Sequence, residues 1–248
     1  MYQPLIKFHP YPAIITQVLS IFAKTPLVMK RLLIIGLLFM VACGGSTKST
    51  NRLLAEVREA DQGIRHQMAA LTKAVTVEGR TELIDSLILT SEQVERIDTR
   101  NVVIVDSLLQ GGLPKGLSTE SYKTIWLVID HAPLQMQQKH LPLIEQMAAQ
   151  GLIAQSDYAT LFDRIAMGQH KPQRYGSQAV QFGTDEKQHL YLWPVECVQR
   201  IDSLRTAVGM SPIDEYLLLL TEATGIEAQF DPAITVEEME HLRGKGQQ

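Results

Sequence analysis

Residues 29–45, MKRLLIIGLLFMVACGG, do not fit the pattern of the rest of the chain. Residues 29–31 form a basic head, residues 32–40 are an unbroken apolar run, and residues 41–43 end that run with small side chains. This order is typical of an export signal. The apolar run is shorter than the roughly 20 residues that a membrane-spanning helix needs. We therefore expect residues 29–42 to be a signal peptide, although a buried core helix is the alternative.

The end of the signal, MVAC, resembles the lipobox of bacterial lipoproteins, with Met40 where leucine is more usual. In that class of signal, the peptidase cuts before the cysteine and the cysteine carries the lipid. The resemblance implies that Cys43 is lipidated and that the protein binds a membrane through this lipid. Residues 44–50, GGSTKST, lack the acidic run that resembles a surface-export signal. We therefore expect a location in the bacterial cell envelope, at the outer membrane and facing the periplasm.

Residues 1–28 precede the basic head of the signal and contain a weaker apolar run. Because a lipoprotein signal normally begins close to its basic residues, we expect translation to start at Met29 and residues 1–28 to be a misassigned upstream extension. A genuine long leader is the alternative. Of the two cysteines, Cys43 would be acylated, so Cys197 has no partner for an intramolecular disulfide. Cys197 is expected in the core, since free cysteine behaves as a small apolar residue.

The charge balance argues against nucleic acid as a partner. The whole chain has a formal net charge of −4, and removal of residues 1–42 takes away four basic residues and no acidic one, which leaves −8. An acidic surface repels the phosphate backbone that dominates binding to nucleic acids. No basic patch with interleaved aromatic residues is present in the sequence either.

The periodicity of the remaining chain predicts one mainly helical domain, residues 51–248, that follows a flexible polar tether, residues 43–50. Residues 177–193 alternate around GTDEK and predict a small β-hairpin. The segment 118–133 is ambiguous between helix and strand, because a capping-type start precedes the strand-like run TIWLVI. Helices are expected over residues 51–75, 91–110, 134–152, 158–167, 194–208, 211–223 and 235–243.

The stretch DRIAMGQHKPQRYGSQ, residues 163–178, gathers many hydrogen-bonding side chains around one proline. Burying such groups costs on the order of 1–3 kcal/mol each unless they find partners. They must therefore satisfy one another, a ligand or water. His131, which closes an apolar run earlier in the chain, adds a side chain that titrates near neutrality. These residues make up the candidate site.

Several motifs, in order, resemble the bacterial family called domain of unknown function 6624. They are DQGIR, IDTRN, LLQGGLP, IDHAPLQMQQKHLPLI, YATLFDRI and KPQRYGSQ, and the resemblance covers about residues 53–220. The last motif has serine where the family is expected to have threonine, which keeps the hydroxyl. The resemblance implies no established reaction. It marks these polar positions: Asp61, Arg65, Asp98, Asn101, His131, Gln138, Asp163, Arg164, Gln173, Tyr175 and Gln178.

Two functions are compatible with this pattern. In the first, the domain has a binding or structural role in the cell envelope, with a small-molecule or envelope partner that the sequence does not identify. In the second, it is an exported enzyme in which His131 is the general acid or base, Asp163 orients His131 or a water, and Arg164 holds an anionic or carbonyl group. The substrate would then be bound by Gln138, Gln173, Tyr175 and Gln178.

The sequence gives no indication of a metal site or a cofactor. The histidines are scattered, and neither HxxxH nor HExxH occurs. A glycine-rich phosphate loop and a GxSxG nucleophile motif are also absent from the sequence. We therefore expect neither a bound metal nor a cofactor.

Overall fold

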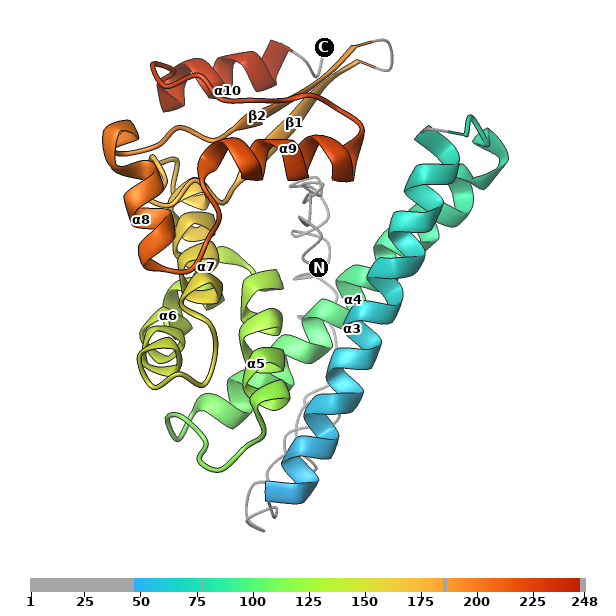
Figure 1. Cartoon of the computed structure of the whole chain (residues 1–248). Coiled ribbons are helices and arrows are strands. Elements are labelled where there is room, and N and C mark those ends of the chain that lie inside the picture. Colours follow the sequence, from blue (N-terminus) through green and yellow to red (C-terminus); the bar gives the residue numbers. More distant parts are fainter. Residues whose placement is uncertain (1–46, 77, 185–186, 246–248) are drawn as a thin grey trace.

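The computed structural model describes residues 47–76, 78–184 and 187–245 (Figure 1). The described chain is mainly α-helical, as predicted, and contains one small three-stranded sheet. The expected signal peptide and Cys43 lie outside the described residues. Within the described residues, no helix is both long and apolar enough to cross a membrane.

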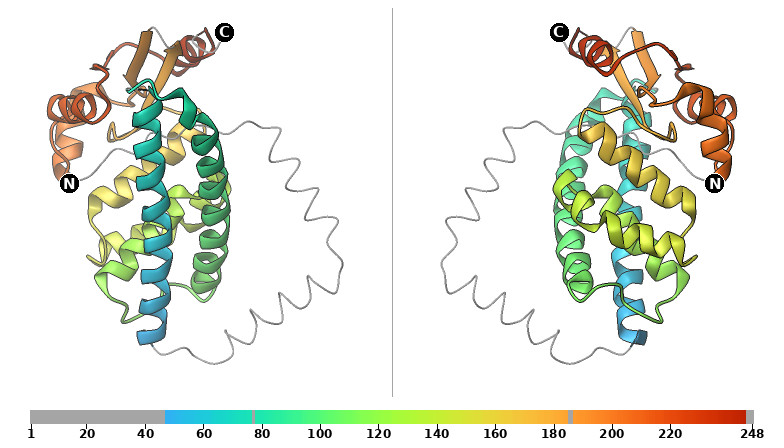
Figure 2. Two further views of the ribbon diagram at one scale, coloured as in Figure 1. Left: turned by 90° about the vertical axis from the view of Figure 1, so that its right-hand side faces the viewer. Right: turned by 90° about the vertical axis from the view of Figure 1, so that its left-hand side faces the viewer.

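A long antiparallel pair of helices forms one side of the molecule (Figures 1 and 2). It consists of α3 (Thr47–Thr76) and α4 (Ile84–Leu109), joined through the short 3₁₀ helix η1 (Thr81–Leu83). On α4, residues 87, 90, 94 and 97 follow one another at alternating spacings of three and four, and all are at least half-buried. This spacing places them on one stripe, which packs against α3. The distal half of the pair extends away from the remaining helices (Figure 1).

Helices α3 and α4 both begin earlier in the chain than predicted from the sequence. Helix α4 begins at Ile84 rather than near Ser91, and the Ser91 hydroxyl donates to the carbonyl of Ile88 inside the helix. Serine can bond to a preceding carbonyl in this way instead of capping a helix. Helix α3 begins at Thr47, so it includes part of the expected polar tether. Its first turns are held in place because Asn51 accepts a hydrogen bond from the Ser118 amide at 3.1 Å.

Three further helices complete the main core: the first packs against this pair, and the other two pack against the first and against each other. They are α5 (Thr119–His131), α6 (Leu134–Ala149) and α7 (Gln155–Gly168). The ambiguous segment is therefore a helix, and the Ser118 side chain caps it by accepting from the Ser121 amide at 3.2 Å. Helix α5 is the central element, since nine of its residues are buried. The core includes Leu54, Val105, Ile125, Ile129, Ile144 and Leu161.

The C-terminal part contains the predicted hairpin, β1 (Ala179–Thr184) and β2 (Lys187–Leu192). A third strand, β3 (Ala228–Gln229), pairs in parallel with β2 and was not predicted from the sequence. Around the sheet lie η2 (Val198–Arg200), α8 (Ile201–Ala207), α9 (Ile213–Thr224) and α10 (Val236–Lys245).

The helix expected over residues 194–208 is therefore shorter than predicted. The backbone just after β2 is extended there, because Gln173 and Val195 form a β-bridge and the Glu196 amide donates to the Gln173 carbonyl. Helix α9 begins at Ile213, two residues after its expected start, and its N-cap residue, Pro212, provides no side-chain cap. The carboxylate of Asp202, on α8, accepts from the Ile213 amide at 2.8 Å and takes that role.

Candidate functional site

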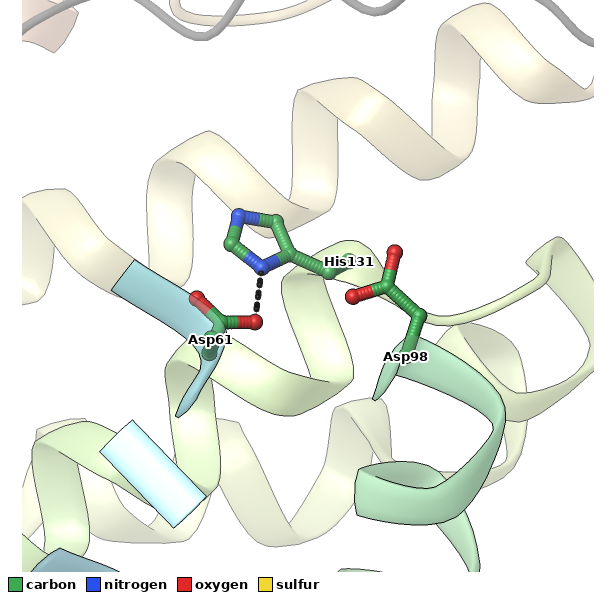
Figure 3. A group of neighbouring side chains, drawn as sticks. All are labelled: Asp61, Asp98 and His131. Atoms are coloured by element: carbon green, nitrogen blue, oxygen red, sulfur yellow. Dashed lines mark hydrogen bonds and ion pairs between the residues drawn. The ribbon is translucent and has the colours of Figure 1, made fainter. Parts of the chain in front are cut away.

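Three helices place polar side chains next to one another in the core. Asp61 comes from α3, Asp98 from α4 and His131 from the C-terminal end of α5 (Figure 3). Arg65 follows Asp61 by four residues and therefore lies on the same face of α3. Asn101 follows Asp98 by three residues on α4. We call these five residues the three-helix cluster.

The centre of the three-helix cluster is the contact between His131 and Asp61. Nδ1 of His131 lies 2.9 Å from Oδ1 of Asp61, and both side chains are at most 3% exposed. Gln62 donates to the other oxygen of Asp61 at 2.7 Å. Burial acts to raise the pKa of Asp61, but the hydrogen bond and charge of His131, the charge of Arg65 and the Gln62 hydrogen bond together lower it. Asp61 is therefore ionised at neutral pH.

Arg65 links the two carboxylates of the cluster. Its Nη2 donates to Oδ1 of Asp98 at 2.7 Å, and its Nε lies 3.1 Å from Nδ1 of His131. Nδ1 cannot both donate to Asp61 and accept from Arg65. Because Asp61 is ionised and acts only as an acceptor, the proton is on Nδ1 and the contact with Asp61 is the hydrogen bond. The other ring nitrogen, Nε2, has no hydrogen-bond partner among the described residues.

Two buried side chains of the cluster have polar atoms without a hydrogen-bond partner among the described residues. These atoms are Nε2 of His131 and both Nδ2 and Oδ1 of Asn101. Asn101 is 1% exposed, so bulk water does not reach its amide. Leaving a buried polar group unsatisfied costs about 1–3 kcal/mol. Such groups call for a ligand or an ordered water.

The charge of the three-helix cluster also bears on what it can bind. Burial raises the pKa of Asp98, and the charge and hydrogen bond of Arg65 oppose this rise only in part. With both carboxylates ionised, Asp61, Asp98 and Arg65 together carry a formal charge of −1. One ligand-type atom from each of Asp61, Asp98 and His131 lies within 4.8 Å of the others, which is close enough for a metal ion to be considered. In this structure, however, the guanidinium of Arg65 already bridges these side chains.

Asp163, predicted to orient His131, is bonded to a different part of the chain. It is fully buried in the second half of α7 and accepts hydrogen bonds from the backbone amides of Arg174, Tyr175 and Ser177 at 2.8–3.1 Å. The Ser177 hydroxyl adds a further bond at 2.9 Å. Burial raises the pKa of Asp163, and these donated hydrogen bonds oppose the rise. Asp163 thus holds the loop before β1.

Gln173 and Gln178 belong to the same loop and bond mainly to backbone groups. The side chain of Gln173 donates to the carbonyls of Gln178 and Trp193 at 2.9 and 2.7 Å and accepts from the Gln178 amide at 2.8 Å. The Gln178 side chain donates to the Ser177 hydroxyl at 3.1 Å. All of the hydrogen-bonding capacity of the Gln173 amide group except one lone pair is used within the fold.

The remaining residues of the predicted site also make their contacts with residues other than His131. Arg164 forms a buried ion pair with Asp130 at 2.8 Å. Tyr175 is half-buried and its ring meets that of Phe162 edge-on. Gln138 is exposed on α6, whereas its neighbour Gln137 is buried and donates to the Asp130 carbonyl at 2.8 Å.

Arg205 supports this loop from α8, a role that the sequence analysis did not identify. Its side chain donates to the carbonyls of Tyr175 and Gly176, both at 2.8 Å, and its guanidinium lies over the ring of Tyr216. The Tyr216 hydroxyl in turn donates to the Ser177 carbonyl at 2.7 Å. Burial raises the pKa of Tyr216 to about 12. The loop from Gln173 to Gln178 is therefore fixed from both sides by buried polar groups.

A groove of about 400 Å³ runs between α3 and α5, and its lining includes none of the five residues of the three-helix cluster. Gln62, which donates to Asp61, is part of its wall. The groove begins near the N-terminus of α5, where Arg58 of α3 and Glu120 form an ion pair. Its full lining is Asn51, Ala55, Arg58, Glu59, Gln62, Ser118, Glu120, Ser121 and Thr124.

The structure defines a mainly helical domain with a buried histidine–carboxylate cluster at the junction of α3, α4 and α5. A model of the family of unknown function DUF6624 matches residues 49–229, and the chain belongs to this family. The match covers every residue of the three-helix cluster and the loop bound to Asp163. No curated protein and no solved structure matches the chain.

Proposed function

We propose that this protein is a lipid-anchored protein of the bacterial cell envelope that binds a small polar ligand at the three-helix cluster. The lipid would be attached to Cys43, and only residues 44–46 separate that cysteine from the start of α3. A spacer this short would keep the N-terminal end of α3 close to the membrane. The periplasmic side of the outer membrane is the proposed location.

One observation carries the proposed ligand site: His131 is held at Nδ1 by Asp61, while its buried Nε2 has no partner among the described residues. A histidine that only stabilised the fold would be expected to use both nitrogens. The unpartnered amide of Asn101 supports the same reading. By contrast, Asp163 and Gln173 have their partners within the loop, which supports a structural role for them.

A second candidate function is catalysis, and the orientation of His131 favours it. An ionised carboxylate that accepts from Nδ1 fixes the ring and leaves Nε2 free as a general base. In this proposal Asp61 orients His131 and Arg65 supplies the positive charge, in place of Asp163 and Arg164. Nε2 is buried in this structure, so a reaction would require the site to open.

Native mass spectrometry of protein extracted from cells in mild detergent tests the ligand site. The parent should carry a small-molecule mass that His131→Gln lacks. His140→Gln is the matched control, because His140 is also buried and bonds to a carboxylate, Asp106, at 2.7 Å. Equal occupancy in all three proteins, or an absence of bound mass in the parent, would contradict the proposal.

The anchor has an independent test. A Cys43→Ala protein should move from the membrane fraction to the soluble fraction when cells are broken. A Cys197→Ala protein is the control and should remain with the membrane. If the Cys43→Ala protein stays membrane-bound in high salt, the proposed lipid anchor is wrong.

A further inference from the structure

We propose that the end of the molecule next to Cys43 docks on anionic phospholipid headgroups, and that three exposed basic residues make this contact. They are Lys48, Arg52 and Lys115. This inference rests on the proposed lipid anchor and goes beyond it, because it names a second membrane contact and the lipid chemistry that the contact requires. It is carried by the length of the spacer, by the contacts at this end of the fold and by the distribution of charge.

The spacer limits how far this end of the molecule can lie from the bilayer. Four peptide units join Cys43 to Thr47, the first residue of α3. An extended chain spans at most about 3.6 Å per residue, so Thr47 lies within about 14 Å of the acylated cysteine. At about 1.5 Å per residue, the other end of α3, at Thr76, is roughly 43 Å from Thr47. Only one end of the α3–α4 pair is therefore held beside the headgroups.

The loop between α4 and α5 lies at the same end of the molecule as the start of α3 (Figures 1 and 2). The Ser118 amide, at the end of this loop, donates to Oδ1 of Asn51 on α3 at 3.1 Å. The Tyr122 hydroxyl donates to the Pro114 carbonyl at 2.7 Å and fixes the middle of the loop. A hollow of about 270 Å³ is lined both by Lys115 and by the first turn of α3. The loop and the start of α3 therefore form one surface.

This surface is basic, although the chain as a whole is acidic. We call residues 47–55 and 107–119 the anchor-side pole. The pole contains three basic residues, Lys48, Arg52 and Lys115, and no acidic one, whereas the chain after the expected signal peptide has a net charge of −8. Basic residues beside a membrane are attracted to the negative surface potential of anionic lipids. Such a patch can add a second, electrostatic contact to a lipid anchor.

The acidic residues that flank the pole do not cancel its charge. Glu56 pairs with Arg52 at 3.3 Å, but both side chains are more than half exposed, and exposed ion pairs are weak. Glu120 pairs with Arg58, which lies outside the pole. The two lysines of the pole form no ion pair among the described residues. They are therefore free to contact lipid phosphates.

The far end of the α3–α4 pair has the opposite charge. Residues 73–85, around the turn between the two helices, contain three acidic and two basic residues. An anionic surface therefore attracts the anchor-side pole and repels this turn. The pair would point away from the bilayer, and Asp61 of the three-helix cluster would lie about 21 Å along α3 from Thr47. Docking would thus keep the proposed ligand site clear of the headgroups.

Hydrogen–deuterium exchange of the purified protein, as matured in cells, tests the docking in an excess of vesicles. Vesicles of phosphatidylcholine alone are compared with vesicles that contain an equal share of phosphatidylglycerol. We expect the amides of residues 110–117 to exchange about threefold or more slowly on the anionic vesicles. Salt at about 1 M should abolish the difference, because it reduces the screening length to about 3 Å. Residues 78–83, at the far turn, should exchange equally on both.

A matched pair of lysine variants tests the role of charge. Lys115→Glu should remove most of the slowing at residues 110–117. Lys73→Glu makes the same change at the far end of α3, outside the anchor-side pole, and should retain the slowing. Both lysines are exposed, so both variants should fold.

Equal exchange on the two kinds of vesicle, or equal effects of the two lysine variants, would overturn the docking. The intact mass of the same protein shows whether Cys43 is acylated, so the anchor is judged separately. If the protein is acylated but shows no slowing, the docking is wrong and the anchor stands. If the slowing occurs in a protein without the lipid, the anchor is wrong and the docking stands.

Discussion

Nδ1 of His131 donates a hydrogen bond to Oδ1 of Asp61 over 2.9 Å, although the two residues are 70 positions apart in the chain. This contact connects α5 to the long α3–α4 pair at its middle. It also fixes the orientation of the ring, with Nδ1 facing Asp61 and Nε2 without a partner among the described residues. The contact therefore serves both the packing of three helices and the proposed binding of a ligand.

Replacement of Asp61 and Asp98 should change stability with opposite dependence on pH. The folded pKa of Asp61 is lowered, so its ionised form stabilises the fold above the unfolded pKa of about 4, and this contribution is lost as the pH falls through the folded pKa. The folded pKa of Asp98 is raised, so its contribution is greatest below the unfolded pKa and falls as the pH rises.

Urea unfolding between pH 3 and pH 7 measures this difference. The free-energy cost of Asp61→Asn should shrink on acidification, while that of Asp98→Asn should grow. Parallel curves for the two variants would contradict the assigned directions of the pKa shifts.

Asp163→Asn should destabilise the protein strongly. The amide nitrogen of the new side chain would replace one acceptor oxygen and face the buried backbone amides of residues 174, 175 and 177. Breaking such a network should cost about 3–5 kcal/mol of unfolding free energy. Asp231→Asn is the control, because Asp231 also accepts a backbone hydrogen bond but is exposed, and it should cost less than about 1 kcal/mol. Similar costs for both variants would refute a structural role for Asp163.

Gly176→Ala should disturb the same loop through packing as well as backbone strain. Gly176 has φ of +64°, and an added Cβ would lie 3.2 Å from the Cδ1 atoms of Ile201 and Ile213. Gly209 has φ of +75° with no atom within 4 Å of an added Cβ, so Gly209→Ala isolates the strain. We expect both variants to lower the melting temperature. Gly176→Ala should lose about 1–3 kcal/mol more unfolding free energy than Gly209→Ala. Equal falls would show that the packing contact is unimportant.

Most of the helices were predictable because they have a buried face at helical spacing, but contacts between elements were not. The strand β3 pairs over only two residues, Ala228 and Gln229, which is too short to leave an alternating pattern. The start of α4 depends on packing against α3, which local caps such as Ser91 do not reveal.

The candidate site shows the same limit of sequence reasoning. Proximity to the polar stretch 163–178 suggested that Asp163 is the partner of His131, whereas the fold gives that place to Asp61, far earlier in the chain. The pairs Asp61 with Arg65 and Asp98 with Asn101 have helical spacing, so each pair could be placed on one face from the sequence. The two pairs meet His131 only because three helices pack together. The spacing of residues along the sequence does not predict that packing.

The protonation of the two ring nitrogens of His131 is the most direct test of the account, and long-range ¹H–¹⁵N spectra of the purified protein measure it. His131→Gln assigns the signals. For the neutral ring, the account predicts a proton on Nδ1, and a signal from unprotonated Nε2 that shifts when ligand is added. A proton on Nε2, with Nδ1 accepting from Arg65, would contradict the proposed site.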